Sequence, residues 1–581
     1  MAVITAEADK RSTALWSEKN MSIKIKVIAL NARYSHSCLA LFYLRNELEK
    51  NLESCQVEIC QYTINDPYYT LLQRISEGET DFYFFSALIW NSNLVERIIK
   101  DLITASCQTP IVIGGPQGPV VTKNLGFPAN LTLFTGAIEG ADNQFYADLA
   151  RKDLKSQYNA STSGGTGLHY PYRSSDFDDH LKARSVYYES SRGCPFSCSY
   201  CLSSANITVF HKDLDQVFAE LDDILQHRPP VVRFLDRTFN DKPERCVRIW
   251  EYLRERGGDT LFHFEIAPDR FTEEMFETLG TIPTGRFQFE MGVQSTNPET
   301  LKAIRRPMNS ERAGEVIRRL RKMETIHLHA DLILGLPFET VDSFHQSLND
   351  IFMMQPHYIQ MGLLKLLPST RIEKERVQHR YRAERSPPYG VLANQWLNEN
   401  QLRTLYWLGE CVEKCVNNRY FPSLWLYLIN IEEDAAQFFS KLAELFYEHG
   451  YFWQAITQEP LSSLIKQRVK KREDAPLITE LLRFDWLRCG HRFLPAHLQD
   501  GVEPLDEQRR TLFTQLPETL SGVYDIRSRK HFFKKSVFCS FSRETLAYIG
   551  YEVKAKKGIV RFRPEREQTV LSLHTCDVLE W

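Results

Sequence analysis

The sequence has 581 residues, of which 43% are hydrophobic and 25% are charged, and its formal net charge is −3. This is the profile of a soluble globular protein, and the length predicts three or four domains. The near-zero charge excludes a strongly basic chain and gives no reason to expect a polyanionic partner. No apolar run approaches the roughly 18 residues of a membrane span.

The chain has 13 cysteines, an odd number spread over its length. This argues against a disulfide scaffold and favours a reducing, cytoplasmic compartment. Residues 1–22 lack the apolar core of a signal peptide. We expect them to be a disordered leader or the product of a mis-assigned start, because Met21 directly precedes the first strand-like run.

Residues 23–153 alternate between strand-like and helical segments. Apolar strand-like runs occur at 24–31, 57–64, 82–90, 110–115 and 131–136. Helical segments lie between or after them at 39–52, 94–106 and 141–153. This alternation predicts an α/β fold, namely a flavodoxin-like, Rossmann-type domain with ligands at the carboxyl ends of its parallel strands.

Two of these predicted strands end in a distinctive way. Ser86-Ala87-Leu88 ends the third, and Gly114-Gly115 ends the fourth. A Ser-x-Leu and a Gly-Gly at these places resemble the cobalamin-binding domains. The resemblance implies that Ser86, Leu88, Gly114 and Gly115 admit the nucleotide tail of cobalamin. The usual Asp-x-His-x-x-Gly is missing, so we expect His36 to be a loop residue and not a cobalt ligand.

Residues 154–182 are rich in Ser, Gly and Tyr and show no apolar period, which predicts a linker. The next segment, 183–382, opens with Cys194, Cys198 and Cys201 at the spacing C-x3-C-x2-C. A four-cysteine zinc site requires a second pair. Three thiolates suit instead a [4Fe–4S] cluster with one open iron.

Strand-like runs and helical segments also alternate after the cysteines. The strands are predicted at 187–190, 231–239, 261–268, 286–295, 327–337 and 358–368, with helices such as 243–256 and 310–323 between them. Six β/α units predict a partial (β/α)6 barrel with functional groups at the carboxyl ends of the strands. Polar residues stand at those ends: Asp236, Glu265, Glu290, Gln294, Ser295, Arg306 and Asp331.

The cysteine spacing, with Tyr200 before the third cysteine, resembles the radical S-adenosylmethionine (SAM) superfamily. The resemblance implies that Cys194, Cys198 and Cys201 bind the [4Fe–4S] cluster. It also implies that SAM is bound by Tyr200 and by the strand-end groups Asp236, Glu265, Gln294, Ser295, Arg306 and Asp331. One departure is FLDRTFN at 234–240, where many members have Gly-Gly-Glu.

Residues 383–581 have helical periodicity, for example at 399–418 and 435–450, with a strand-like run at 559–564. They predict a mostly helical domain whose role the sequence does not define. Cys411 and Cys415 fall four residues apart on one helix face. Their apolar neighbours favour core packing over metal ligation.

Together these features resemble the cobalamin-dependent radical SAM enzymes. The resemblance implies methylation of an unactivated carbon through a 5′-deoxyadenosyl radical and methylcobalamin. It implies a small-molecule or peptide substrate and an electron donor such as flavodoxin or ferredoxin. We expect neither a membrane nor a nucleic acid as partner.

Three alternatives stay open. One is a cobalamin-assisted radical oxidation or rearrangement. Another is an RNA methylthiotransferase, which would need a second three-cysteine cluster, with Cys38, Cys55, Cys60 and Cys107 as candidates. The third is a non-catalytic iron–sulfur or cobalamin sensor.

Overall fold

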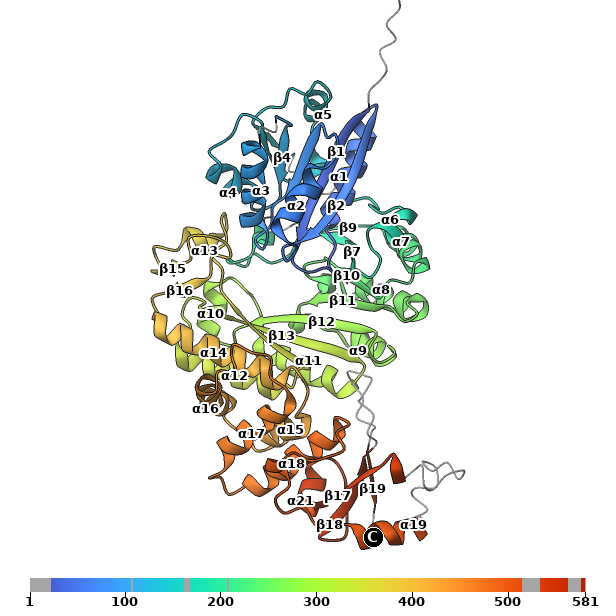
Figure 1. Ribbon diagram of the computed structural model, residues 1–581, viewed down its shortest axis with the longest axis vertical. Helices are drawn as coiled ribbons and strands as arrows, with labels where there is room; N and C mark the ends of the chain where they lie inside the picture. Colours follow the sequence, from blue (N-terminus) through green and yellow to red (C-terminus); the bar gives the residue numbers. More distant parts are fainter. Residues whose placement is uncertain are drawn as a thin grey trace, which may run out of the picture. The chain divides into compact units, whose positions relative to one another are not determined.

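The computed structural model describes residues 22–105, 108–160, 168–205, 208–514, 533–562 and 576–579. The expected leader, residues 1–22, therefore lies outside the described residues except for residue 22. The chain divides into two compact units, Met1–Arg184 and Ser185–Trp581 (Figure 1).

The first unit is built on a six-stranded parallel sheet with the strand order β2-β1-β3-β4-β5-β6. Its strands are β1 (Ile23–Asn31), β2 (Cys55–Thr63), β3 (Phe82–Ser86), β4 (Ile111–Gly114), β5 (Leu131–Thr135) and β6 (Gln157–Asn159). The strands read as apolar runs because helices bury both faces of such a sheet. The order is that of the flavodoxin-like fold, as predicted. Strand β2 lies on one side of β1 and β3 on the other, so the strand order reverses at β1/β3.

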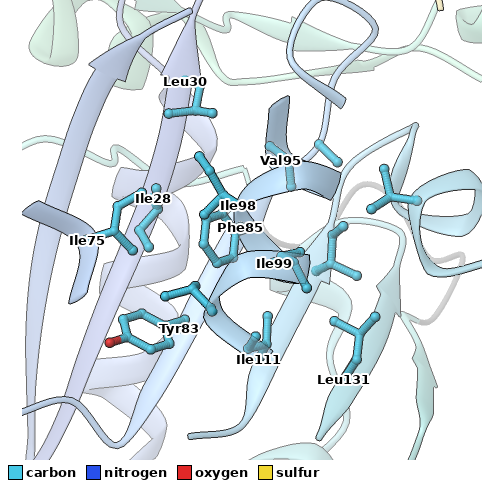
Figure 2. Close-up of a cluster of buried hydrophobic side chains, with 14 of the residues drawn as sticks. Ile28, Leu30, Ile75, Tyr83, Phe85, Val95, Ile98, Ile99, Ile111 and Leu131 are labelled. Atoms are coloured by element: carbon cyan, nitrogen blue, oxygen red, sulfur yellow. The ribbon is translucent and has the colours of Figure 1, made fainter. Parts of the chain in front are cut away.

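The helices of this unit cover the two faces of the sheet. They are α1 (Leu39–Asn51), α2 (Tyr68–Ser76), α3 (Ser92–Thr104), α4 (Gly118–Asn124) and α5 (Asn143–Ala150). On one face, Ile75 of α2 and Val95, Ile98 and Ile99 of α3 pack on alternate strand residues such as Phe85 (Figure 2). On the other face, Phe145 of α5 meets Phe134 of β5, with ring centroids 5.1 Å apart.

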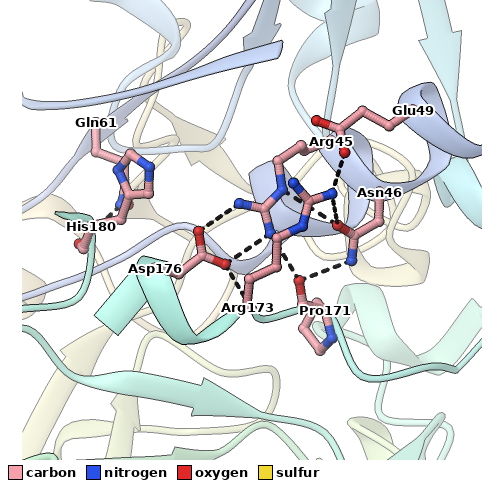
Figure 3. Close-up of polar contacts among 8 residues, drawn as sticks. All are labelled: Arg45, Asn46, Glu49, Gln61, Pro171, Arg173, Asp176 and His180. Carbon is pink, nitrogen blue, oxygen red and sulfur yellow. Dashed lines mark hydrogen bonds and ion pairs between the residues drawn. The ribbon is translucent and has the colours of Figure 1, made fainter. Parts of the chain in front are cut away.

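The segment expected to be a linker is instead built into this unit. It supplies the edge strand β6 and the helix α6 (Ser174–Asp179). The Asp176 carboxylate accepts hydrogen bonds from both terminal nitrogens of Arg45 on α1, at 2.5 and 2.8 Å, and both side chains are buried (Figure 3). Asp176 also caps its own helix by accepting the Arg173 amide. Residues 161–167 lie outside the described part of the chain.

The second unit is built on another six-stranded parallel sheet, with the order β14-β13-β12-β11-β10-β7. Its strands are β7 (Val186–Tyr188), β10 (Val231–Phe234), β11 (Leu261–Ile266), β12 (Phe287–Gln294), β13 (Ile326–Leu334) and β14 (Tyr358–Leu363). Within the described residues β7 and β14 do not pair, so the sheet stays open. This confirms the predicted partial barrel.

Helices cover the apolar outer face of this sheet. They are α7 (Leu214–Gln226), α8 (Pro243–Arg256), α9 (Glu273–Gly280), α10 (Pro298–Ala303), α11 (Ser310–Met323) and α12 (Val341–Met354). Trp250 of α8 stacks on Phe289 of β12, with centroids 5.4 Å apart, and Phe234 stacks on Phe264. Because side chains alternate along a strand, the polar residues between these aromatics face the concave side.

The C-terminal part of this unit is mostly helical, as predicted. Its helices are α13 (Arg371–Lys374), α14 (Glu399–Val416), α15 (Pro422–Asn430), α16 (Ala435–Glu448), α17 (Gln458–Val469), α18 (Ala475–Arg488), α19 (Asp506–Thr514) and α21 (Arg543–Tyr548). An antiparallel sheet of β17 (Val537–Ser542), β18 (Lys557–Phe562) and β19 (Cys576–Leu579) follows. The described residues also form two short strand pairs: β8 (Ser191–Arg192) with β9 (Phe210–His211), and β15 (Arg382–Ala383) with β16 (Val391–Ala393).

The edge strand β14 is covered by α14. Asn417, just after α14, donates from its side-chain amide to the Ile359 carbonyl (2.8 Å) and accepts the Ile359 N–H (2.9 Å). One side chain thus satisfies both main-chain groups of an edge residue, as a neighbouring strand would. Tyr358 Oη also donates to Glu413 of α14 at 2.9 Å.

None of the helices in the described ranges is long and apolar enough to cross a membrane.

Candidate active site

The three cysteines of the C-x3-C-x2-C segment converge in one loop between β8 and β9. Cys194 and Cys198 are buried and Cys201 is half-buried, and all three are free thiols. They share a contact cluster whose other members are Phe196, Tyr200 and Ala267.

Main-chain contacts fix this loop on both sides. The Ser199 N–H donates to the Ile304 carbonyl, and the Ser199 carbonyl accepts the Ile372 N–H, both at 2.9 Å. Gly193 starts the loop with φ +109°, and a Cβ there would lie 2.2 Å from the Thr208 carbonyl oxygen. Only glycine fits both conditions.

The electrostatics of the loop combine burial with nearby cations. Burial raises the pKa of the Cys198 thiol, and Arg306, whose Nη1 lies 3.9 Å from Cys198 Sγ, partly offsets that rise. The guanidinium of Arg270 stacks on Phe196, 4.4 Å from its ring centroid. Cys194 Sγ lies 3.6 Å from the Thr238 hydroxyl. Such cations favour thiolates, which are the form that binds metal.

No three His, Cys, Asp or Glu side chains in the described ranges are grouped around a single-ion position. A single ion needs every ligand atom within about 2.5 Å. A four-iron cluster is wider and accepts thiolates that stand farther apart, so this finding does not count against the cysteines as ligands of a cluster. Their residue type, number and shared loop fit a [4Fe–4S] cluster.

Asp236, predicted to bind SAM, holds the start of the cysteine loop. This buried carboxylate accepts the Ser190 N–H at 3.0 Å and the hydroxyls of Ser190 and Ser191 at 2.6 Å each. These bonds hold the start of the cysteine loop, and they occupy most of the acceptor capacity that we expected Asp236 to offer SAM.

Three acidic side chains stand on neighbouring strands of the concave face. Glu265 of β11 pairs in register with Glu290 of β12, and Asp331 follows on β13. Burial raises the pKa of Asp331 well above its usual range, and both glutamates add to that rise. Burial also raises the pKa of Glu265, against the effect of Arg237, whose Nη1 donates to it at 3.0 Å.

Beside this acidic group are two polar atoms that make no hydrogen bond. Asp331 Oδ1 and Arg306 Nε are both buried and lack a hydrogen-bond partner in the described structure. A buried polar atom without a partner is costly, and a ligand that pairs with it removes that cost. The Arg306 guanidinium fits the carboxylate of SAM, and the Asp331 carboxyl group fits its amino or hydroxyl groups.

Gln294 is the last residue of β12 and Ser295 follows it, and their side chains have different surroundings. Gln294 has φ +71° and lies beside Gly292, where a Cβ would lie 2.2 Å from the Gln294 amide nitrogen. Ser295 is buried, and its hydroxyl donates to Glu339 at 2.9 Å. Ser295 therefore supports the strand end from within, whereas Gln294 and the partly exposed Tyr200 remain at the site.

The sequence interpretation missed a chain of polar residues along the concave face. Gln288 Nε2 lies 2.6 Å from His329 Nε2, and its Oε1 lies 3.4 Å from His263 Nδ1. His327 Nδ1 lies 3.1 Å from His329 Nε2, and Arg419 donates to His327 Nε2. Burial lowers the pKa of His329 to about 4 and of His327 to about 2, so both rings are neutral at pH 7. The available signal was the alternation in FHFE, FQFE and HLHAD.

In the first unit, the expected cobalamin residues lie at the carboxyl edge of the sheet. Ser86 ends β3 and Gly114 ends β4, directly paired in register. Gly115 has φ +90°, and a Cβ on it would lie 2.5 Å from the Ala87 carbonyl oxygen. A Cβ on Gly114 would meet only one atom, at 3.8 Å. Gly115 thus allows a close turn of the main chain, and Gly114 leaves the space beside Ser86 open to a ligand.

The loops around this edge carry aromatic side chains. Trp90, after β3, is 48% exposed, and its Nε1 donates to the Leu30 carbonyl at the end of β1. Tyr34, after β1, is 64% exposed. The Leu88 N–H donates to the buried Asn91 side chain, which orders the turn after Ser86. The Arg184 guanidinium lies over one face of the Tyr34 ring, 4.6 Å from its centroid. The exposed parts of Trp90 and Tyr34 at the β1/β3 switch point suit a large flat ligand.

Two segments of the chain match known family models. Residues 188–351 match the Radical SAM superfamily. This segment is a radical SAM domain. Residues 377–562 match a family described as a protein of unknown function, DUF4080.

Curated relatives of this chain include a methylthiotransferase and a methyltransferase. The ribosomal protein uS12 methylthiotransferase RimO of Herpetosiphon aurantiacus is 25% identical over 225 residues, covering 36% of this chain and 47% of that protein. The cobalamin-dependent radical SAM methyltransferase TokK of Streptomyces tokunonensis is 26% identical over 198 residues, covering 32% of this chain and 29% of that protein. The chain thus spans less than half the length of either relative.

The fold also matches a solved structure. The cobalamin-dependent S-adenosylmethionine radical enzyme OxsB, with aqua-cobalamin bound, superposes with a TM-score of 0.57 at 14% identity, covering 80% of each chain. At this identity the match shows a shared fold. The radical SAM domain and the flavodoxin-like sheet before it both follow the predicted architecture.

Proposed function

We propose that this chain is a cobalamin-dependent radical SAM enzyme that methylates an unactivated carbon of a small molecule or peptide. The observation that carries the proposal is one loop of the radical SAM domain. It brings Cys194, Cys198 and Cys201 together and places Cys198 beside Arg306. When bound, the cluster and SAM supply radical chemistry for hydrogen abstraction, and cobalamin supplies the methyl group.

The chain's own residues bind and orient SAM. Arg306 forms a charge-assisted pair with the methionyl carboxylate, and Asp331 accepts from the amino or hydroxyl groups. Gln294, Glu265 and Tyr200 line the same end of the strands. Behind them, Asn240 fixes the turn after β11, because its side chain both donates to and accepts from the main chain of Ala267 at 2.9 Å.

The first unit binds cobalamin at the β1/β3 switch point. Ser86 offers a hydroxyl, Leu88 an apolar wall, and Gly114 and Gly115 a side-chain-free path for the nucleotide tail. The support is the order of the sheet, the exposed aromatics beside Ser86 and the fold shared with OxsB.

The experiment is anaerobic reconstitution with iron, sulfide and cobalamin, followed by SAM carrying a deuterated methyl group, a reductant and an extract of the source cells. We expect 5′-deoxyadenosine and a product that carries the deuterated methyl. Flavodoxin or ferredoxin should replace the chemical reductant. Formation of 5′-deoxyadenosine without methylated product would favour the radical oxidation or rearrangement, and absence of SAM cleavage would refute an enzymatic role.

A methylthiotransferase is a second candidate, because RimO is among the relatives. Such a protein needs a second three-cysteine cluster. In the first unit Cys55 starts β2 and pairs with the first residue of β1, whereas Cys38 follows the other end of β1. Nine residues of strand separate those ends by about 30 Å. Cys107 lies outside the described residues. Iron content decides: about four irons per chain favour the methyltransferase and about eight the rival.

A further inference from the structure

We propose that a cavity between the radical SAM domain and the C-terminal helices binds a small organic anion with an apolar or aromatic body. The cavity has a volume of about 450 Å³ and is lined by the ends of α11 and α12, by α15, and by residues close to α14, α18 and α21. That volume suits a compact ligand. The cavity opens at the amino-terminal end of β14, away from the cysteine loop, and the proposed methyl transfer does not use it.

Positive charge dominates the lining. Arg318, Arg321 and Lys322 come from the last turns of α11, Arg419 comes from the loop between α14 and α15, and Arg488 ends α18. Among the described residues that line the cavity, the only carboxylate is that of Glu324, which is exposed and lies 3.8 Å from Arg321.

Three of these cations have partners: Arg488, Arg419 and Arg321, the last only through the exposed Glu324. Arg488 is held by the buried Asp485 at 3.3 Å, and Arg419 donates to His327. Arg318 and Lys322 are exposed and form no ion pair in the described structure. Burial lowers the pKa of Arg321, a penalty that an anion would offset.

His357 supplies an independent sign of a missing acceptor. The residue lines the cavity, is only 9% exposed, and accepts the Leu328 N–H on Nδ1 at 3.1 Å. Burial lowers the pKa of His357, so the ring is neutral. A neutral imidazole that accepts on Nδ1 carries its proton on Nε2. His357 Nε2 has no hydrogen-bond partner, so a buried N–H donor is left unsatisfied beside the cations.

The opposite wall indicates the rest of the ligand. Phe352 and Trp425 line the cavity and face each other edge to face, with ring centroids 6.4 Å apart. A phosphate or carboxylate would pair with Arg321 and the neighbouring cations, and an aromatic or aliphatic body would rest on Phe352 and Trp425. Both oxyanions share this chemistry, so the experiment compares them.

The test is calorimetric titration of the full-length protein, at low ionic strength, with phenyl phosphate, benzoate and the neutral phenol. We expect one site for phenyl phosphate or benzoate and much weaker binding of phenol. Arg321→Ala should weaken binding of the anion about tenfold or more. Arg319→Ala is the matched control, because it removes a charge from the same helix, where Arg319 pairs with Glu273 outside the cavity.

If Arg321→Ala does not fold, substitutions of the two exposed cations, Arg318 and Lys322, still test the proposal. Arg318→Glu and Lys322→Glu change surface residues, and both should weaken anion binding while Arg319→Ala leaves it unchanged. The proposal is overturned if the wild type binds neither anion, if phenol binds as well as the anions do, or if these variants bind like the wild type. None of these outcomes depends on SAM cleavage, so the proposed methyl transfer stands or falls separately.

Discussion

At the scale of single residues, the site is marked by polar atoms that lack partners. Asp331 Oδ1 and Arg306 Nε are buried and unsatisfied, whereas Asp236 and Ser295 have their hydrogen bonds within the fold. All four are polar residues that the sequence assigned to strand ends, and the sequence did not separate them. Burial and partners distinguish a ligand-binding side chain from a positioning one.

Arg306→Ala and Asp331→Ala should each weaken SAM binding, because each removes a charge-assisted contact worth roughly 1.5–3 kcal/mol. Equilibrium binding of SAM to the reconstituted protein measures the loss. Iron content serves as the control, since the cluster should survive both changes. SAM affinity that stays at the wild-type value in both variants would refute the assignment.

Glu339 predicts a pH dependence of stability. Burial raises its pKa from 4.5 to about 8. Between these values the folded protein keeps a proton that the unfolded chain releases, so the free energy of unfolding falls as the pH rises from 4.5 to 8. Glu339→Gln keeps a neutral acceptor for Ser295 and should reduce this fall. Melting temperatures at about pH 5 and about pH 8 test it, and equal pH dependence in variant and wild type would contradict it.

At the scale of elements, most strands and helices could be predicted from the sequence. Helices α8 and α11 have the predicted bounds because their apolar period is strong and their ends are marked. Strand β6 and helix α6 could not be predicted. Their sequences carry no apolar period, and α6 is held by long-range polar contacts, among them the buried pair of Arg45 with Asp176. Such a contact leaves no local pattern in the sequence.

Asp176→Ala should loosen α6 from α1, because it leaves the buried Arg45 guanidinium without its partner. Breaking a buried pair in this way costs about 3–5 kcal/mol. Hydrogen exchange should quicken in 168–184 and in α1. Glu49→Ala is the control, because Glu49 pairs with Arg173 at the exposed surface, where ion pairs contribute roughly 0–1 kcal/mol. Equal exchange in both variants would contradict the role of the buried pair.

The cysteine loop and helix α14 offer a second contrast between elements. Cys194→Ala, Cys198→Ala and Cys201→Ala should each abolish the cluster's absorbance and 5′-deoxyadenosine formation, because two thiolates cannot hold the cluster. Cys411→Ala and Cys415→Ala should leave the iron content unchanged, since both thiols are fully buried in α14. If only the second pair changes the iron content, the cluster is assigned to the wrong cysteines.

At the scale of the whole molecule, the two family segments are not separate structures. The radical SAM sheet ends in β14, and Asn417, just after α14 in the DUF4080 segment, satisfies the hydrogen-bonding groups at that edge.

A chain that stops at residue 382 exposes that edge, so it should aggregate where the full-length protein does not. Light scattering of the two proteins measures this. Asn417→Ala in the full-length protein should cause much less aggregation than the truncation does, because the rest of α14 still covers β14. A truncated protein that remains monomeric would refute this role of α14.

The position of α14 in the sequence also sets a delay during synthesis of the protein. On the ribosome, β14 is complete at Leu363, but Asn417 follows 54 residues later (417 − 363). At roughly 5–20 residues per second, the edge of the sheet waits roughly 3–11 s for its cover. During that interval the nascent chain presents an unpaired strand of an otherwise formed sheet. From this order of synthesis we expect the protein to need chaperones, or fast translation between Leu363 and Asn417, more than its finished fold would suggest.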